Sequence, residues 1–407
     1  MTQSPKLALT FILATVTLDA IGIGLIFPVM PDLIREVTGE DLAHAALWGG
    51  VLATSFAVMQ FLFGPILGSL SDRYGRRPIL LLSLLVMGID YLVMAVAPSI
   101  WLLLIARLVA GVTAATYSTA TAFIADITPP DQRGARFGLI GAGFGIGFVL
   151  GPLIGGLLAG IDTRAPFYAA SALAFANLAF GWWVLPETVT EATRRPFTLA
   201  RANPLGALRA VGRLPGVRLT LACFLILGIA MNVYPSIWAY YGQARFGWDS
   251  TMVGISLAIY GISFALGQAL LVGPMIRRFG EHRAAHYGMW VDVTTLAALG
   301  LVTSPVLALM ITPITALGGA VTPALQALAS RAAPADAQGE VQGVLASLNA
   351  IAMITSPLIM TATFSAFTAP DAPVYAPGAP FLLASALMLA CVALHVLGPR
   401  FRQRPSA

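Results

Sequence analysis

The chain has 407 residues, of which 58% are hydrophobic and only 10% are charged. A water-soluble globular protein is excluded, because this composition leaves too little polar surface to cover the fold. The net charge of +5 comes from basic residues in short clusters between long apolar runs, a pattern that fits the face of a membrane and argues against nucleic-acid binding.

Apolar runs long enough to cross about 30 Å of hydrocarbon predict twelve helical spans, since only a helix pairs all backbone polar groups within its own segment. The first six cover residues 7–27, 46–70, 78–97, 99–126, 136–159 and 166–185. The second six cover residues 217–240, 250–276, 284–303, 305–330, 341–367 and 379–398. The first run is too long for a signal-peptide core and is predicted to be a retained helix.

Several landmarks of the first half recur 205 positions later. Gly75 corresponds to Gly280, Pro152 to Pro357, and the set Pro129, Asp131, Gly134 and Gly138 to Pro334, Asp336, Gly339 and Gly343. One constant offset predicts two parallel copies of a six-helix unit, an arrangement typical of transporters. We therefore expect an all-α membrane protein with bundles at residues 1–185 and 217–407. The polar linker at 186–216 is predicted to contain a short amphipathic helix.

The distribution of basic residues sets the orientation. Lys6, the arginines around Gly75 and Gly280, and those of the linker fall on one side, while Arg35, Arg164 and Arg245 fall on the other. Because basic residues are retained in the cytoplasm, both termini are predicted to be cytoplasmic.

Four ionisable residues lie inside predicted spans, namely Asp19, Asp90, Arg107 and Asp292. Each costs roughly 2.5–3.5 kcal/mol at the centre of a span, so each needs a partner, a wet cavity or a function. In one interpretation at least one carboxyl group carries a proton during transport. In the other, Arg107 pairs with one acid as a structural tie, and another acid bonds to hydroxyls such as those of Thr15, Thr17 or Thr294.

A second group of charges surrounds the turn at Gly75, between the second and third spans. It consists of Asp72, Arg73, Arg76 and Arg77, with Asp126 predicted at the same membrane face, and is called the Gly75 cluster below. We expect its ion pairs to latch helix ends and to break when the transporter opens. Plain membrane topology would explain the arginines but not Asp72.

The fifth span carries a glycine face. Gly143, Gly147, Gly151 and Gly155 recur every four residues, with Pro152 and Gly156 beside them. This spacing places the four on one side of a helix and permits close approach of another helix. The face is predicted to be either a static packing surface or a seam that keeps the two halves sealed on one side.

Amide and aromatic side chains within the spans predict a mixed pocket for a flat, partly apolar ligand. The candidates for substrate binding are Gln60, Asn232, Trp238, Phe264, Gln268 and Gln326. Asn349 and the tyrosines Tyr117, Tyr234, Tyr240 and Tyr241 accompany them.

Five segments, at residues 18–26, 64–77, 151–156, 322–327 and 338–343, resemble the major facilitator superfamily. Within that superfamily the chain is similar to the twelve-span drug/proton antiporters of the tetracycline efflux group. The resemblance implies a proton-coupled exporter of the bacterial inner membrane, working as a monomer and without a resident cofactor, whose drug leaves as a magnesium chelate. It also implies that Asp19, Asp90, Asp292 and Arg107 serve proton coupling. It places Asp72 and Arg76 in a gating loop, and the charges and glycine spacing described above make Arg73, Arg77, Asp126, Gly147, Gly151, Pro152 and Gly155 further gating candidates. Phe264 departs from the family, where a histidine is common.

Two alternatives remain. The same fold could export another hydrophobic compound, a sugar or a native metabolite. A membrane enzyme is disfavoured, because His44, His282, His286 and His395 are scattered along the chain and no metal or nucleophile spacing occurs. Cys223 and Cys391 lie in apolar runs and are predicted to be buried apolar residues.

Overall fold

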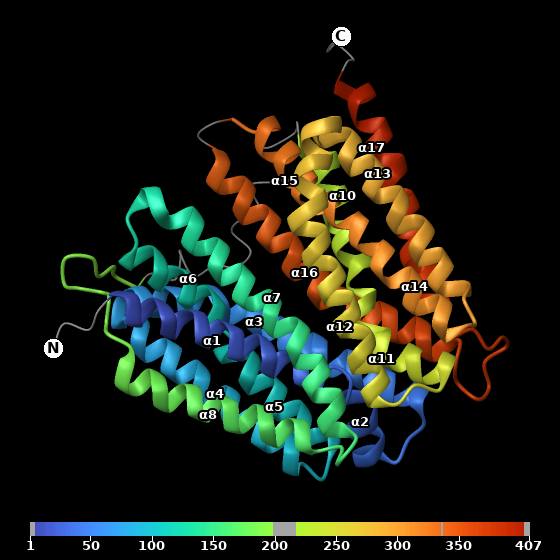
Figure 1. Ribbon diagram of the computed structural model, residues 1–407, viewed down its shortest axis with the longest axis horizontal. Helices are drawn as coiled ribbons and strands as arrows, with labels where there is room; N and C mark the ends of the chain where they lie inside the picture. The colour runs from blue at the N-terminus through green and yellow to red at the C-terminus, as the bar shows by residue number, and fades with distance from the viewer. Residues whose placement is uncertain (1–4, 198–216, 335–336, 403–407) are drawn as a thin grey trace. The chain divides into compact units, whose positions relative to one another are not determined.

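The computed structural model describes residues 5–197, 217–334 and 337–402, and every regular element in these ranges is a helix (Figure 1). The first half contains α1 (Pro5–Ile26), α2 (Met30–Thr38), α3 (Leu42–Tyr74), α4 (Arg76–Val96), α5 (Ile100–Thr113), α6 (Thr116–Ile127), η1 (Pro130–Gln132), α7 (Arg133–Ala159) and α8 (Ala165–Val184). The second half contains α10 (Arg218–Met231), α11 (Val233–Phe246), α12 (Ser250–Gly267), η4 (Gln268–Val272), α13 (Gly273–Leu301), α14 (Pro305–Thr315), η5 (Ala316–Ala320), α15 (Val321–Ala332), α16 (Gln338–Ala366) and α17 (Ala379–Arg402). The predicted all-helical membrane fold is confirmed.

The helices account for the twelve predicted spans. Eleven helical stretches of the described residues are long and apolar enough to cross a membrane, and one of them, Ser250–Leu301, has 52 residues. This stretch turns at Gly280, whose φ of +76° is a conformation that glycine adopts far more readily than other residues. It therefore supplies the eighth and ninth spans, just as Gly75, with a φ of +115°, separates α3 from α4.

The described residues form two compact units that do not follow the halves of the sequence throughout. Unit 1 contains Met1–Glu40, Ser55–Pro204 and Asp249–Ala258, and unit 2 contains Asp41–Thr54, Leu205–Trp248 and Ile259–Ala407. The start of α3 thus belongs to unit 2 and the start of α12 to unit 1. The predicted amphipathic helix of the linker falls largely on residues 198–216, outside the described ranges.

The two exchanged helix starts pack on equivalent positions. In unit 1, a Cβ atom placed on Gly254 would lie 3.1 Å from the Cα atom of Gly156. In unit 2, a Cβ atom on Gly50 would lie 3.2 Å from the Cβ atom of Thr361, the residue that corresponds to Gly156 in the repeat. Each unit therefore contains a helix start from the other half of the chain, held by close contact with a proline-containing helix.

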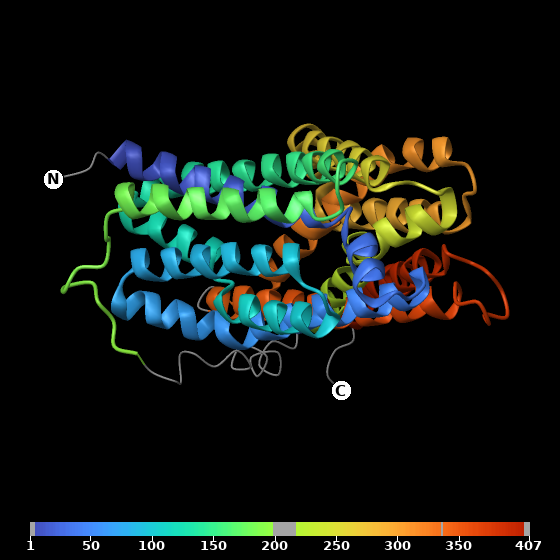
Figure 2. The ribbon, with the colours of Figure 1, turned by 90° about the horizontal axis from the view of Figure 1, so that it is seen from below.

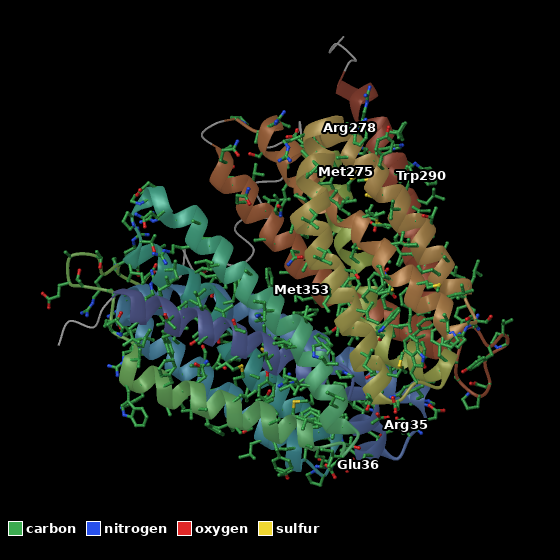
Figure 3. All side chains as sticks on the ribbon, in the orientation of Figure 1. Arg35, Glu36, Met275, Arg278, Trp290 and Met353 are labelled. Carbon is green, nitrogen blue, oxygen red and sulfur yellow. The ribbon has the colours of Figure 1, made fainter. Side chains whose placement is uncertain are left out.

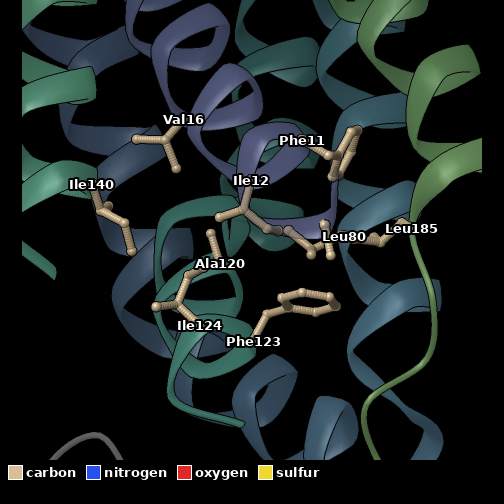
Figure 4. Packing of buried hydrophobic residues seen from close by; sticks show 10 residues of the cluster. Phe11, Ile12, Val16, Leu80, Ala120, Phe123, Ile124, Ile140 and Leu185 are labelled. Carbon is tan, nitrogen blue, oxygen red and sulfur yellow. The ribbon is translucent and has the colours of Figure 1, made fainter. Parts of the chain in front are cut away.

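Unit 1 is built around α1, which packs along α7 and α8 (Figures 1 and 2). Figure 4 shows a buried apolar cluster in which Phe11 and Ile12 of α1 meet Leu80 of α4, Phe123 of α6 and Ile140 of α7. In unit 2, α17 packs against both α10 and α13. These contacts fix the helices that carry the predicted site residues.

Two of the three arginines on the predicted outer side cap helix ends. Arg164 donates to the backbone carbonyl groups of Ala95 and Ala97 at 2.8 and 3.0 Å, and to Glu36 of α2, which is labelled in Figure 3. Arg245 donates to the backbone carbonyl groups of Leu301 and Val302 at 3.2 and 2.9 Å. Basic groups stabilise the unpaired carbonyl groups at a helix C-terminus, which explains these exceptions to the charge bias.

Candidate functional site

Unit 1 holds a buried ion pair between two neighbouring helices. Arg107 of α5 pairs with Asp90 of α4, and its Nε atom also donates to the Oδ1 atom of Asp90 at 3.3 Å. The guanidinium carbon lies 5.5 Å from the centre of the Phe56 ring. Because each charge is compensated by the other, this geometry is the structural tie that the sequence left open as one interpretation.

Asp19 is the second buried acid of unit 1, with 7% of its surface exposed. It lies on α1 and interacts electrostatically with Tyr91 of α4. Gly22, one turn further along α1, makes room for the tyrosine, because a Cβ atom there would lie 3.0 Å from the Tyr91 hydroxyl oxygen.

The expectation that a buried acid bonds to one of three threonine hydroxyls is wrong. Thr15 donates to Asn177 at 3.1 Å, Thr17 to the carbonyl of Leu13 at 2.8 Å, and Thr294 to the carbonyl of Trp290 at 2.9 Å. Two of these bonds satisfy the hydroxyl within its own helix, a local alternative that sequence spacing alone does not rule out.

Unit 2 holds Asp292 in a different environment. The residue lies on α13 with 3% exposure, and its Oδ2 atom has no hydrogen-bond partner among the described residues. Tyr234 of α11 and Tyr260 of α12 both interact with it electrostatically, and their rings stack at 5.4 Å. Gly318 in the 3-10 helix η5 lies against the carboxylate, since a Cβ atom there would be 2.6 Å from its carbon.

Phe264 and Gln268 adjoin the same part of unit 2. Phe264 stacks on Tyr260 with ring centres 5.9 Å apart, and Gln268 donates to the carbonyl of Gly319 at 3.3 Å. Gln268 begins the π-helix η4, and Gly319 lies in η5. Irregular turns of this kind within spans occur where a helix lines a functional site. The structure thus brings Asp292, Phe264 and Gln268 together.

The other predicted binding residues are placed differently. Trp238 is 4% exposed, and it packs in an aromatic cluster with Tyr241, Trp248 and Phe381, which indicates a role in packing. Asn232 donates through its side chain to the carbonyl of Gly228 at 2.7 Å, and Gln60 donates to that of Ala114 at 3.3 Å, both beside helix breaks. Gln326 is half-buried on α15.

The Gly75 cluster forms the expected ion pairs. Arg76 pairs with Asp72 at 2.6 Å and with Asp126 at 3.1 Å, so it joins the ends of α3, α4 and α6. Arg77 donates to the carbonyl of Trp182 at 2.6 Å, whereas Arg73 is exposed and lies over the ring of Tyr74. All these contacts lie within unit 1.

Sequence reasoning missed Glu187, which completes this cluster. Its carboxylate accepts hydrogen bonds from the backbone N–H groups of Arg76 and Arg77 at 2.9 and 3.2 Å, at the first turn of α4. The next residue, Thr188, donates to Asp126 at 3.0 Å. An acid that serves a helix N-terminus from a distant segment has no spacing by which the sequence could reveal it.

The glycine face of α7 packs on α1, in the same unit. A Cβ atom on Gly143, Gly147, Gly151 or Gly155 would lie within 2.8 Å of an atom of α1, in each case from Thr17, Ala20, Ile21 or Leu25. This contact fits the static packing surface and differs from the expected seam between halves. Beside the face, Gly156, Gly160 and the carbonyl of Pro152 lie against the start of α12.

Three of the four histidines gather, contrary to the expectation that they are scattered. The rings of His282 and His395 lie 4.0 Å apart, and those of His286 and His395 lie 6.3 Å apart. Within the described part of the chain, no group of three His, Cys, Asp or Glu side chains is arranged to hold a metal ion. Cys223 and Cys391 are buried as predicted, and each thiol faces the other's backbone carbonyl.

Comparison with known sequences gives consistent results. The sequence model of a family described as Major Facilitator Superfamily matches residues 12–357 and 219–406. The tetracycline resistance protein of class C from Escherichia coli is 43% identical over 359 residues, which is 88% of this chain and 90% of that protein. The class G protein from Vibrio anguillarum is 41% identical over 87% of this chain and 89% of its own length.

Solved structures share the fold. The human organic anion transporter MFSD10 is similar with a TM-score of 0.69 and 25% identity, covering 96% of this chain and 99% of its own. A bacterial homolog of the human lysosomal transporter Spinster, in an inward-facing conformation, reaches a TM-score of 0.78 at 19% identity, with coverage of 100% and 99%.

Proposed function

The chain belongs to the Major Facilitator Superfamily, and from this premise we infer that it exports a tetracycline-type drug in exchange for protons. It is a multi-pass membrane transporter of small molecules and not an enzyme. The observation that carries the choice of drug is the 43% identity to a tetracycline resistance protein over 90% of that protein's length.

The proposed proton coupling rests on Asp292 and Asp19. A buried carboxylate without a cationic partner is costly when ionised, so Asp292, with its unpartnered Oδ2 atom, is suited to alternate between a charged and a protonated form. In the proposed cycle, the charged form favours capture of the drug from the cytoplasm and protonation from outside favours its release. Coupling then requires that the two conformations differ in their affinity for drug and proton.

The proposed substrate contacts lie in unit 2. Phe264, backed by Tyr260, offers a flat aromatic face, Gln268 offers an amide, and the Asp292 carboxylate can attract the positive charge of a drug carried as a magnesium chelate. Magnesium belongs to the cargo in this proposal, and no resident cofactor is needed. Gln326 and Gln60 are proposed to contribute further amide contacts.

We place the protein in the bacterial inner membrane as a monomer, with both termini in the cytoplasm. The support is the bias of Lys and Arg toward one set of loops. The capping roles of Arg164 and Arg245 add to it, because they account for two of the three exceptions.

The test uses inverted membrane vesicles from cells that express the protein, with a dye that reports the pH of the lumen. Adding tetracycline with Mg²⁺ to acid-loaded vesicles should drive proton release from the parent, and Asp19→Asn and Asp292→Asn should abolish it. Asp131→Asn is the matched control, since this acid lies in η1 and is exposed, unlike the buried acids Asp19 and Asp292. Undiminished exchange in both site variants would refute the coupling, and a parent without any drug-driven signal would refute the substrate.

Two observations favour another exported compound. Phe264 can neither titrate nor bind a metal-chelated drug through a ring nitrogen, and Multidrug resistance protein 2 of Bacillus subtilis is 26% identical over 68% of this chain. Resistance profiling separates the candidates, because a strain that resists other apolar drugs but not tetracycline would support this alternative.

A further inference from the structure

The two halves carry the same ion pair with its charges reversed. Gly75 and Gly280 correspond at the offset of 205, and the same offset maps Arg76 onto Glu281 and Asp126 onto Arg331. Arg76 and Asp126 pair at 3.1 Å in unit 1, and Arg331 and Glu281 pair at 2.8 Å in unit 2. Each pair ties the helix after the glycine turn to the end of the fourth span of its half.

Helix dipoles act on the two pairs in opposite ways. Arg76 is the first residue of α4 and Asp126 is in the last turn of α6, so each charge opposes the partial charge of its helix end. Glu281 follows the break at Gly280, where a helix begins, and Arg331 lies in the last turn of α15. Both of these charges complement the partial charges of their helix ends.

This difference explains why the Gly75 cluster needs additional partners. Around Arg76 the structure adds Asp72 and Ser71, and Glu187 supplies the negative charge that the start of α4 lacks. In unit 2 the first residue after the glycine turn is itself the acid. Glu281 and Arg331 can therefore hold their turn as a pair.

We propose that Glu281 and Arg331 are positioning residues of the transport cycle, whose charge-reversed ion pair fixes the Gly280 turn against the end of α15 in unit 2. They do for this turn what Arg76, Asp126 and Glu187 do together for the turn at Gly75. The inference rests on the proposed function, because its principal readout is drug transport. It assigns a role to two residues that touch neither the drug nor the buried acids.

The experiment measures tetracycline uptake by inverted vesicles for Glu281→Arg, Arg331→Glu and the double swap Glu281→Arg/Arg331→Glu. Each single variant replaces attraction by repulsion and should lower the maximal uptake rate by about three- to tenfold, with KM changed by less than about twofold. The double swap restores attraction but sets both charges against the helix ends. Its rate should lie between those of the singles and the parent.

Arg283→Glu is the matched control, since it makes the same change of net charge as Arg331→Glu at an exposed position two residues from Glu281 and should transport like the parent. A single variant as fast as the parent, or a double swap no faster than either single, would overturn the proposal. If the parent itself accumulates no tetracycline, the proposed function fails, and a double-mutant cycle of thermal unfolding decides the ion pair separately. Additive effects in that cycle would overturn the inference.

Discussion

At the scale of residues, the pairing of Asp90 with Arg107 makes both charges tolerable inside a span. Removing one member of a buried ion pair costs about 3–5 kcal/mol, because the other charge stays uncompensated. We expect Asp90→Asn and Arg107→Met each to lower the thermal unfolding temperature of the purified protein. The double variant should be more stable than either single, and a double variant that loses the sum of both effects would contradict the assigned pair.

Phe264 gives a second prediction at this scale. Its ring is 37% exposed and stacks on Tyr260, so it can offer its other face to a ligand. Aromatic stacking contributes about 0.5–1.5 kcal/mol, which corresponds to a rise in KM of about two- to tenfold for Phe264→Ala. Uptake kinetics measure it, with Phe279→Ala at the Gly280 turn as the control. An unchanged KM would remove Phe264 from the binding surface.

The sequence identified the ionisable residues of the spans but not their partners. Asp90 and Arg107 stand out because charges are rare in apolar runs. The packing of separate helices decides that Arg107 pairs with Asp90 and that Asp292 interacts with two tyrosines. No local spacing in the sequence encodes this packing. The hydroxyl partners were predicted wrongly because Thr17 and Thr294 bond to backbone carbonyl groups of their own helices and Thr15 bonds to Asn177 of another helix.

At the scale of elements, the contact between α1 and α7 depends on glycine. Leucine at Gly147 would meet the Cβ atom of Ala20 and backbone atoms of α1, as a Cβ atom alone would lie 2.6 Å from the former. Overpacking of this kind typically costs 1–3 kcal/mol. Gly147→Leu should lower the unfolding temperature and the yield of folded protein. Gly145→Leu on the same helix should not, because nothing lies within 4 Å of that site, and equal losses in both variants would contradict the packing.

Long apolar runs in the sequence predicted the membrane spans well, but they did not predict the helix breaks or the short helix α2. The breaks at Asn232 and at residues 114–115 lie inside continuous apolar stretches, where hydropathy carries no mark of them. The short helix α2 was missed because a nine-residue segment containing Asp32, Arg35 and Glu36 cannot cross a membrane. It buries Pro31, Leu33 and Ile34 on one face, a pattern too short to stand out in the sequence.

At the scale of the whole molecule, the exchange of helix starts between the halves should be equally sensitive on both sides. Gly254→Leu and Gly50→Leu would each force a side chain into a contact closer than 3.4 Å, and both should destabilise the protein by at least the 1–3 kcal/mol typical of overpacking. Thermal unfolding in detergent measures the effect. Ala265→Leu, at an exposed position of α12, is the control. A large loss in only one of the two variants would argue that the equivalent contacts do not have equal weight.

The repeat predicted from sequence extends to details that composition alone cannot indicate. Ser99 accepts a hydrogen bond from the N–H group of Leu102 at the start of α5, and Ser304 does the same for Leu307 at the start of α14. These two serines are again 205 positions apart. The division into units was less predictable, because the start of a helix can pack away from the rest of it without any change in hydropathy.

The left-handed turns at Gly75 and Gly280 suggest how such a chain can be redesigned. The positive φ at these turns favours glycine, whereas the two charges of an ion pair can exchange places where further partners compensate the helix ends. Divergence after a gene duplication would conserve the glycine turns in both halves and would exchange the charges of the ion pair. A redesigned variant of this protein should therefore keep both glycines and should change the two members of a neighbouring ion pair together.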